Sequence, residues 1–230
     1  MNDTILQIGA LVVPLILAIV FHEVAHGWVA RMLGDPTAHE ARRLSLNPLR
    51  HVDPIGTVVL PGFLALVKAP VIGWAKPVPV NKWRLRNPRL GMMAVAAAGP
   101  GTNLILAGVG AVLLGLLLRP YGAFGEMSGL GAFLAANLVN FLTINIFLAL
   151  FNLLPIPPFD GSHIVEGLLP PHAAEAYGRL RPIGFPLLLV LLIALPSIFP
   201  SFDVVGWLVV PPVNWASGHY FALAEWVAGH

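Results

Sequence analysis

Long apolar runs separated by short polar stretches dominate the chain. No charged residue occurs from Ile5 to Phe21, and apolar runs of this length are typical of transmembrane helices. The hydropathy pattern predicts four spans and a fifth, proline-broken candidate, at residues 5–33, 91–118, 131–154, 183–199 and 203–228. We therefore expect an all-α polytopic membrane protein, with a three-helix core and additional C-terminal helices.

A further apolar stretch, Gly56–Trp74, is predicted not to cross the membrane. Prolines such as Pro61 and Pro70 interrupt it, and a crossing would place the basic residues that follow it outside the cell. We interpret it as a re-entrant or interfacial element. The flanking stretches Ala41–Asn47 and Val71–Val80 alternate in part or are rich in valine, which indicates short strands at the cytoplasmic membrane edge.

The distribution of basic residues predicts the orientation of the chain. Ten of the thirteen Lys and Arg residues lie between Arg31 and Arg89, and Arg179 and Arg181 precede the fourth span. Because cytoplasmic loops of membrane proteins are enriched in Lys and Arg, both stretches are expected in the cytoplasm. The chain is therefore predicted to be a multi-pass protein of the cell membrane with its N-terminus outside.

Composition supports the membrane class and narrows the chemistry. Hydrophobic residues make up 57% of the chain, charged residues 10%, and the mean hydropathy is +0.80. The absence of cysteine excludes disulfides, thiolate metal sites and a cysteine nucleophile. Asn2 and Asp3 replace the basic start of a signal peptide, so we expect the first span to be retained. No repeat or long linker is found, and one membrane-embedded domain is expected over residues 1–230.

The second half of the first span carries the strongest chemical signal, a His-Glu-x-x-His pentad from His22 to His26. Two imidazoles four residues apart share one face of a helix, where both can reach a single zinc ion. The adjacent Glu23 can act on a zinc-bound water. Since ionisable groups at membrane depth are costly and by default mark function, the pattern predicts a zinc-dependent peptidase site.

A third metal ligand is predicted at the end of the third span. The stretch Asn152–Gly161 contains three prolines that cannot all continue a helix, so the backbone is expected to become extended there and to display Asp160 in a cavity. Gly161 is expected to allow a sharp turn. Spans one and three both run inward, which places His22, His26 and Asp160 at one depth, toward the cytoplasmic side.

These two motifs together resemble those of the site-2 protease family of intramembrane zinc metallopeptidases, peptidase family M50. The family pairs His-Glu-x-x-His with a later Asn-x-x-Pro-x-Pro-x-x-Asp-Gly, and both stand unbroken here. The resemblance covers a core of about residues 5–165, ahead of C-terminal helices at about 180–228. It includes Gly99–Asn103, which is similar to the family's Gly-Pro-x-x-Asn element. No PDZ module is inserted, so the chain resembles the short members of the family.

The resemblance implies roles for five residues and a reaction. It assigns one zinc ion to His22, His26 and Asp160, the catalytic base to Glu23, and binding of the substrate carbonyl or its oxyanion to Asn152. The implied function is a zinc metalloendopeptidase of regulated intramembrane proteolysis. It would hydrolyse peptide bonds within or near transmembrane segments of membrane-protein substrates with a zinc-activated water. The expected partners are such a substrate and the lipid bilayer, with no nucleic acid.

Two other classes compete with the protease. A catalytically inactive relative would bind membrane-protein clients without cutting them, but it would not need Glu23. A metal transporter would favour several carboxylates along a path through the bilayer, whereas Glu166, Glu175 and Asp203 lie toward loops and helix ends. The intact glutamate and the scattered acids favour the protease.

Several other polar or small residues have structural interpretations. Gly99, Asn103, Ala107, Ala111 and Gly115 recur every four residues and are interpreted as a packing ridge, with Asn103 in the active site as an alternative. Asn137 and Asn145 are expected to hydrogen-bond between helices. His163 is interpreted as a water-facing residue, with a supporting place beside the metal as the alternative. Asp53 is explained by turn formation before Pro54.

Overall fold

The computed structural model describes residues 3–66, 73–121, 127–199 and 201–229. The long helices are α1 (Asp3–Met32), α4 (Pro88–Leu118), α5 (Gly129–Asn152) and α11 (Val210–Ala228). An apolar arm consists of α8 (Arg181–Leu189), η5 (Val190–Ala194) and α9 (Leu195–Ile198). The shorter elements are α2 (Thr37–Glu40), η1 (Pro48–Arg50), η2 (Pro54–Val59), α3 (Leu60–Leu66), η3 (Lys82–Arg84), α6 (Asp160–Leu168), α7 (Pro171–Gly178) and α10 (Val204–Leu208).

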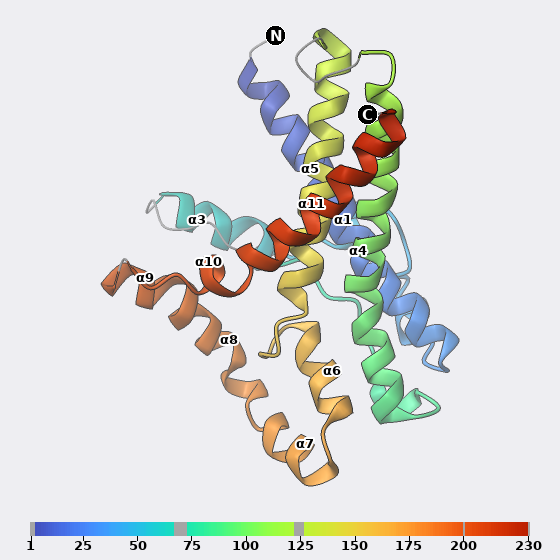
Figure 1. Ribbon diagram of the computed structural model, residues 1–230. Helices are drawn as coiled ribbons and strands as arrows, with labels where there is room; N and C mark the ends of the chain where they lie inside the picture. Colours follow the sequence, from blue (N-terminus) through green and yellow to red (C-terminus); the bar gives the residue numbers. More distant parts are fainter. Residues whose placement is uncertain (1–2, 67–72, 122–126, 200, 230) are drawn as a thin grey trace.

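Helices α1, α4 and α5 pack against one another in one bundle, and α11 crosses α4 and α5 obliquely (Figure 1). Small residues allow the close approach. Ala107 and Ala111 of the expected ridge are fully buried in the core, and a methyl group on Gly115 would lie 2.4 Å from the carbonyl oxygen of Ala224 in α11. Ala107, Ala111 and Gly115 therefore have the packing role predicted for the ridge, because neighbouring helices lie close to this face of α4.

The outer surface of the helices is apolar, as expected of a protein in lipid. Large side chains such as Leu11, Val13, Ile105 and Leu116 are about half exposed or more. Four helices in the described part of the chain are long and apolar enough to cross a membrane, at Ile5–Met32, Pro88–Leu118, Gly129–Asn152 and Arg181–Ile198. An all-α, multi-pass membrane protein is thus confirmed. The fifth predicted span, 203–228, is instead divided between α10 and α11 and is not among these four.

The C-terminal arm is attached to the bundle mainly at its base. A methyl group on Gly184 in α8 would lie 2.6 Å from the Cβ atom of Pro157, and the rings of Phe185 and Trp74 meet edge to face with centroids 5.2 Å apart. Beyond this base the arm diverges from the bundle (Figure 1). The base of the arm therefore contacts the proline-rich segment before Asp160 and the start of the segment 73–80.

In their described residues, the two stretches predicted as strands at the cytoplasmic membrane edge are irregular, and the segment between them begins with short helices. Within 41–47 and 73–80, the described residues contain no strand, and η2 and α3 occupy the first part of Gly56–Trp74. Residues 67–72 lie outside the described residues. In residues 73–80 the strand expectation fails because Pro77 and Pro79 have no N–H to donate to a ladder, and the isolated backbone bonds of Trp74 and Lys76 do not form one. That Gly56–Trp74 is a re-entrant or interfacial element remains a prediction, and its described first part is helical.

Candidate metal centre

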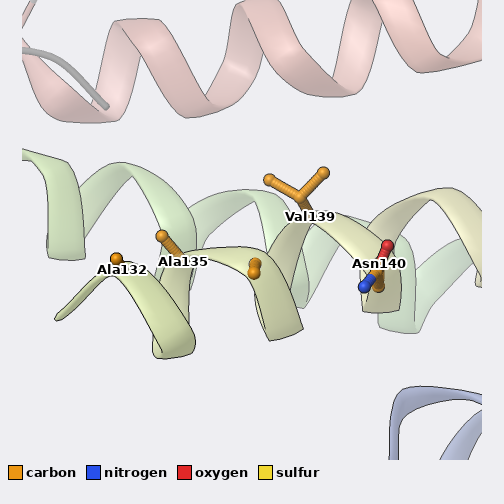
Figure 2. A pocket seen from close by; sticks show the side chains of 5 residues that line it. Ala132, Ala135, Val139 and Asn140 are labelled. Atoms are coloured by element: carbon orange, nitrogen blue, oxygen red, sulfur yellow. The ribbon is translucent and has the colours of Figure 1, made fainter. Parts of the chain in front are cut away.

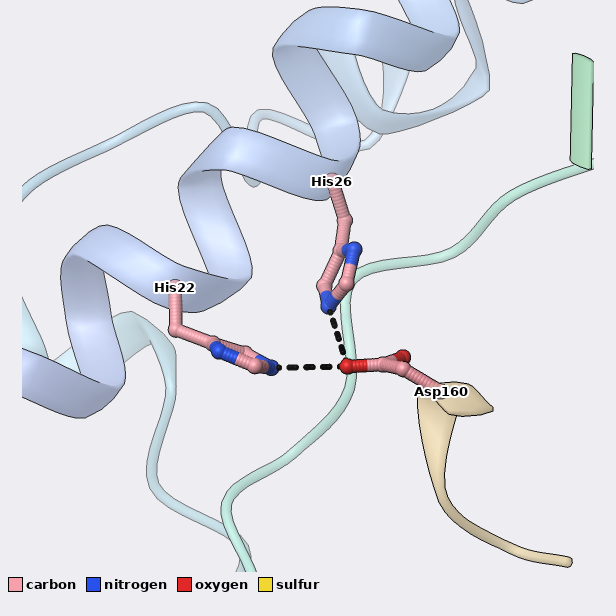
Figure 3. A group of neighbouring side chains, drawn as sticks. All are labelled: His22, His26 and Asp160. Carbon is pink, nitrogen blue, oxygen red and sulfur yellow. Dashed lines mark ion pairs between the residues drawn. The ribbon is translucent and has the colours of Figure 1, made fainter. Parts of the chain in front are cut away.

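Three side chains from opposite ends of the core meet at one point. His22 and His26 project from α1, and Asp160 is the first residue of α6. The Oδ2 atom of Asp160 lies 3.2 Å from Nε2 of His22 and 3.4 Å from Nε2 of His26 (Figure 3). The two histidines are only 7% and 9% exposed. The two sequence motifs are therefore adjacent in the fold and form a nearly enclosed cluster.

Local sequence explains how Asp160 reaches this point. Helix α5 ends at Asn152, the prolines that follow prevent its continuation, and α6 begins at Asp160 after the extended Phe159. The expectation of a sharp turn at Gly161 is wrong, since this glycine lies inside α6. Its role is steric: a methyl group there would lie 2.2 Å from the carbonyl oxygen of Leu153. The missing side chain lets the start of α6 fold back against the end of α5.

The hydrogen bond of His26 determines which ring nitrogen faces the cluster. The Nδ1 atom lies 2.7 Å from the carbonyl oxygen of Val95, which can only accept a hydrogen bond. In the neutral ring the hydrogen is therefore on Nδ1, and the lone pair of Nε2 points toward Asp160. The Nδ1 atom of His22 similarly lies 2.6 Å from Oδ1 of Asn103. This contact favours the active-site alternative for Asn103 that the sequence left open.

The cluster fits a metal ion in charge and geometry. Two imidazole lone pairs and a carboxylate oxygen converge, and the buried Oδ2 of Asp160 receives no hydrogen bond. A cation bound at this point would be held by all three atoms. Ligand atoms of tetrahedral zinc lie about 2.0–2.2 Å from the metal, which places them about 3.3–3.6 Å from each other. The observed 3.2 and 3.4 Å match this spacing closely, and all three ligand atoms lie within 4.8 Å of one another.

Gly99 of α4 keeps this space free. A methyl group at Gly99 would lie 2.5 Å from Nε2 of His26 and 2.6 Å from Cε1 of His22. The sequence placed Gly99 in the packing ridge and did not reveal that it faces the rings of His22 and His26. The only available signal was its position beside Pro100 and four residues before Asn103.

Glu23 lies next to the cluster and is held by the extended segment. Its Oε2 atom accepts a hydrogen bond of 2.8 Å from the backbone N–H of Val78. The segment itself is fixed by bonds from Trp74 N to Gly56 O (3.1 Å) and from Lys76 N to His51 O (2.8 Å). Nothing in the sequence pointed to Val78, because a backbone donor has no residue signature.

Asn152 and Asn137 make local hydrogen bonds only. Each donates from Nδ2 to the carbonyl oxygen four residues earlier in α5, at 2.9 Å to Leu148 and to Phe133 respectively. Asn137 is therefore not the interhelical bonder that we expected. Among the described residues, no hydrogen bond joins Asn152 to the cluster. One N–H of its amide stays available to a ligand.

His163 borders the cluster without joining it. Its Nδ1 atom lies 3.0 Å from Nη2 of Arg181, which also binds Glu166. Burial, followed by the charge of Arg181, holds the pKa of His163 below its ordinary value. A cavity of about 200 Å³ opens here and is lined by Lys82, Arg89 and Glu166, among others. His163 is thus a half-buried neighbour rather than the water-facing residue that we expected.

Two further features lie apart from the cluster. Asp53 caps η2 by accepting hydrogen bonds from Ile55 N (3.0 Å) and Gly56 N (2.7 Å), as its position before Pro54 predicted. A second cavity, of about 280 Å³, lies on α5 (Figure 2). Its lining is Ala132, Ala135, Ala136, Val139 and Asn140. Without a titratable group, this cavity offers no acid–base or metal chemistry.

The fold and the cluster define a membrane protein with the metal-binding constellation of a metallopeptidase, and comparison with known proteins agrees. A family model described as peptidase family M50 matches residues 125–195. "Putative zinc metalloprotease YwhC" of Bacillus subtilis (strain 168) is 42% identical over 187 residues, which cover 80% of each chain. "Putative zinc metalloprotease Rip2" of Mycolicibacterium smegmatis is 30% identical over 193 residues, covering 84% of this chain and 70% of the relative.

An archaeal relative extends the similarity. "Putative zinc metalloprotease MJ0611" of Methanocaldococcus jannaschii is 32% identical over 149 residues, or 64% of each chain. No solved structure matches the chain at a significant level. The chain belongs to peptidase family M50, the site-2 protease family, and is accordingly a zinc metallopeptidase with a multi-pass membrane fold.

Proposed function

We propose that the chain is an intramembrane endopeptidase that cuts membrane-protein substrates within or near their transmembrane segments. The observation that carries this proposal is the position of Glu23 beside the His22–His26–Asp160 cluster, in the second half of an apolar helix long enough to span a membrane. A peptidase that acted only on soluble peptides would gain nothing from chemistry at this depth, where buried ionisable groups are costly. The whole chain would act as one membrane-embedded domain.

The metal site would hold one zinc ion through Nε2 of His22, Nε2 of His26 and a carboxylate oxygen of Asp160. When bound, zinc supplies Lewis-acid chemistry, because it makes water more acidic near neutral pH and polarises a substrate carbonyl. The carbonyl of Val95 and the amide of Asn103 hold the two rings in the orientation that this binding requires.

Glu23 would move the proton. Its Oε2 atom is occupied by the N–H of Val78, which leaves Oε1 to take a proton from the attacking water and to pass it to the leaving amine. The Val78 bond also keeps the carboxylate beside the cluster. Asn152 would donate its free amide hydrogen to the substrate carbonyl oxygen as negative charge develops there.

The substrate must locally leave its helical conformation, because a helical peptide bond is enclosed by its own hydrogen bonds. The extended residues 73–80, next to Glu23, are the part of the chain best suited to lie alongside an unwound substrate. Their place within the basic stretch Arg31–Arg89 favours cleavage near the cytoplasmic side, with the N-terminus of the protein outside.

Cleavage of a single-span substrate in proteoliposomes tests this proposal. Purified wild type and Glu23→Gln are compared on the same substrate, and product masses locate the cut. Zinc-dependent cleavage inside or at the edge of the span, absent in Glu23→Gln, supports the proposal. Cleavage confined to a soluble loop would leave a metallopeptidase that is not intramembrane. Membrane proteomics of cells that carry either form then identifies the uncut substrate that accumulates with Glu23→Gln.

A further inference from the structure

Two buried asparagines connect the first candidate ligand to the centre of the helix bundle. Asn103 of α4 and Asn145 of α5 are both fully buried, at 0% exposed. The Nδ2 atom of Asn103 lies 2.7 Å from Oδ1 of Asn145, and its Oδ1 atom lies 2.6 Å from Nδ1 of His22. A continuous chain of hydrogen bonds therefore joins α5, α4 and α1.

Backbone carbonyls at two points fix the direction of every bond in this chain. The Nδ2 atom of Asn145 lies 2.8 Å from the carbonyl oxygen of Phe141, and Nδ2 of Asn103 lies 3.2 Å from that of Ala18. A carbonyl oxygen can only accept, so both contacts require an amide nitrogen at these positions. The oxygen of Asn145 then faces Asn103, and the oxygen of Asn103 faces His22.

The last bond consequently determines the tautomer of His22. Since the side-chain oxygen of Asn103 has no hydrogen, Nδ1 of His22 must donate one to it. In the neutral ring, Nε2 is then left with a lone pair, directed at Asp160. His26 has the same tautomer through one bond to the backbone carbonyl of Val95. His22 instead depends on the side chains of Asn103 and Asn145, which a substitution can remove.

We propose that Asn103 and Asn145 are positioning residues that select the metal-binding tautomer and orientation of His22. This inference rests on the proposed function, in which His22 is a zinc ligand. Asn103 acts directly on the ring. Asn145 acts through Asn103, and because Ala18 also accepts from Asn103, loss of Asn145 alone should have the smaller effect. Outer hydrogen-bond partners of metal-bound histidines typically change metal affinity about 10- to 100-fold.

Zinc affinity, measured by chelator competition in detergent, tests this role. Asn103→Ala should weaken zinc binding about 10- to 100-fold, and Asn145→Ala by less. Their effects should be non-additive in the double variant. The matched control is Asn140→Ala, which removes a bond of 2.8 Å from α5 to the carbonyl of Ala10 in α1, outside the Asn145–Asn103–His22 chain. The control should keep wild-type affinity.

Asn103→Asp separates positioning from packing. A carboxylate still accepts from Nδ1 of His22 but cannot donate to Asn145 or Ala18. We expect this variant to recover most of the zinc affinity and the visible absorption spectrum of the cobalt-substituted protein, while its melting temperature stays as low as that of Asn103→Ala. Equal zinc affinity in Asn103→Ala and Asn140→Ala, or failure of Asn103→Asp to recover affinity, would overturn the inference. If His22→Ala instead binds zinc as tightly as wild type does, His22 is not a ligand, and the ligand assignment in the proposed function is overturned.

Discussion

Gly99 of α4 lies directly against His26 of α1, so closely that a methyl group on the glycine would be 2.5 Å from the Nε2 atom of the ring. The same methyl group would touch His22. Any side chain at this point of α4 would contact both rings and would occupy the volume that a metal ion needs in the proposed site.

Gly99→Ala should therefore abolish or strongly reduce zinc binding. The control is Gly101→Ala on the same helix, because a methyl group there has no neighbour within 4 Å and both changes raise helix propensity equally. Zinc content per purified chain is the measurement. Full zinc occupancy in Gly99→Ala would mean that the metal does not lie between α1 and α4.

Alanine substitutions should separate the ligands from the base. Replacing His22, His26 or Asp160 with alanine should lower the zinc content of the purified protein, since each removes one ligand atom. Glu23→Gln should keep its zinc and lose cleavage, because the amide cannot accept the proton of water. If Asp160→Ala bound a full equivalent of zinc, this carboxylate would not be a ligand and His163 would have to be tested in its place.

Asn152→Ala should keep zinc and the fold but lower kcat about 10²- to 10³-fold, the usual effect of removing one oxyanion donor. Asn137→Ala is a close control, because it removes the same type of bond within α5, of the same 2.9 Å length. It should leave kcat unchanged. Both variants are compared by cleavage per zinc-loaded protein and by melting temperature, and a normal kcat in Asn152→Ala would exclude the catalytic role.

Single cysteines test the topology, because the natural chain contains none. A cysteine at Lys82 or Arg86 should resist membrane-impermeant thiol reagents in intact cells and react after permeabilisation. One at Tyr121, beyond the far end of α4, should react in intact cells. External labelling at residue 82 would place Lys82 on the same side of the membrane as the N-terminus and contradict the proposed orientation.

Asp35, just after α1, should make stability depend on pH. Burial alone would raise the pKa of its carboxyl group, but the Thr37 hydroxyl and the backbone N–H groups of Asn81 and Thr37 bind the carboxylate and lower the pKa below its ordinary value. Because the folded-state pKa is below the unfolded one, this stabilisation is present above a pH of about 4 and is lost as the pH falls through the folded-state pKa.

Asp35→Asn should accordingly lower the stability of the protein at neutral pH by about 1–3 kcal/mol, since an amide nitrogen in place of Oδ2 cannot accept from Asn81 N. The difference in melting temperature between wild type and Asp35→Asn should shrink as the pH is lowered from 7 to 3. Asn87→Ser, an uncharged change at an exposed helix cap, is the control, because it introduces no group that titrates between pH 7 and 3. A difference that stayed constant with pH would show that the carboxylate charge is not involved.

The sequence by itself determined the membrane class, all four membrane-length apolar helices to within about three residues of their ends, and which residues form the candidate metal cluster. These properties depend on local patterns: hydropathy over a span, the four-residue repeat that places His22 and His26 on one helix face, and prolines that end α5 before Asp160. Each can be interpreted without knowing what packs against it.

Only the tertiary structure decided which other groups surround the cluster. The N–H of Val78 on Glu23, the closeness of Gly99 to both imidazoles, and the Asn145–Asn103–His22 chain all join segments far apart in sequence. A backbone donor and a missing side chain leave no pattern of their own. An asparagine in a transmembrane helix looks the same whether it bonds within its own helix, as Asn137 does, or across helices to His22, as Asn103 does. The distinction arises from which helix faces touch, and that is set by packing over the whole bundle.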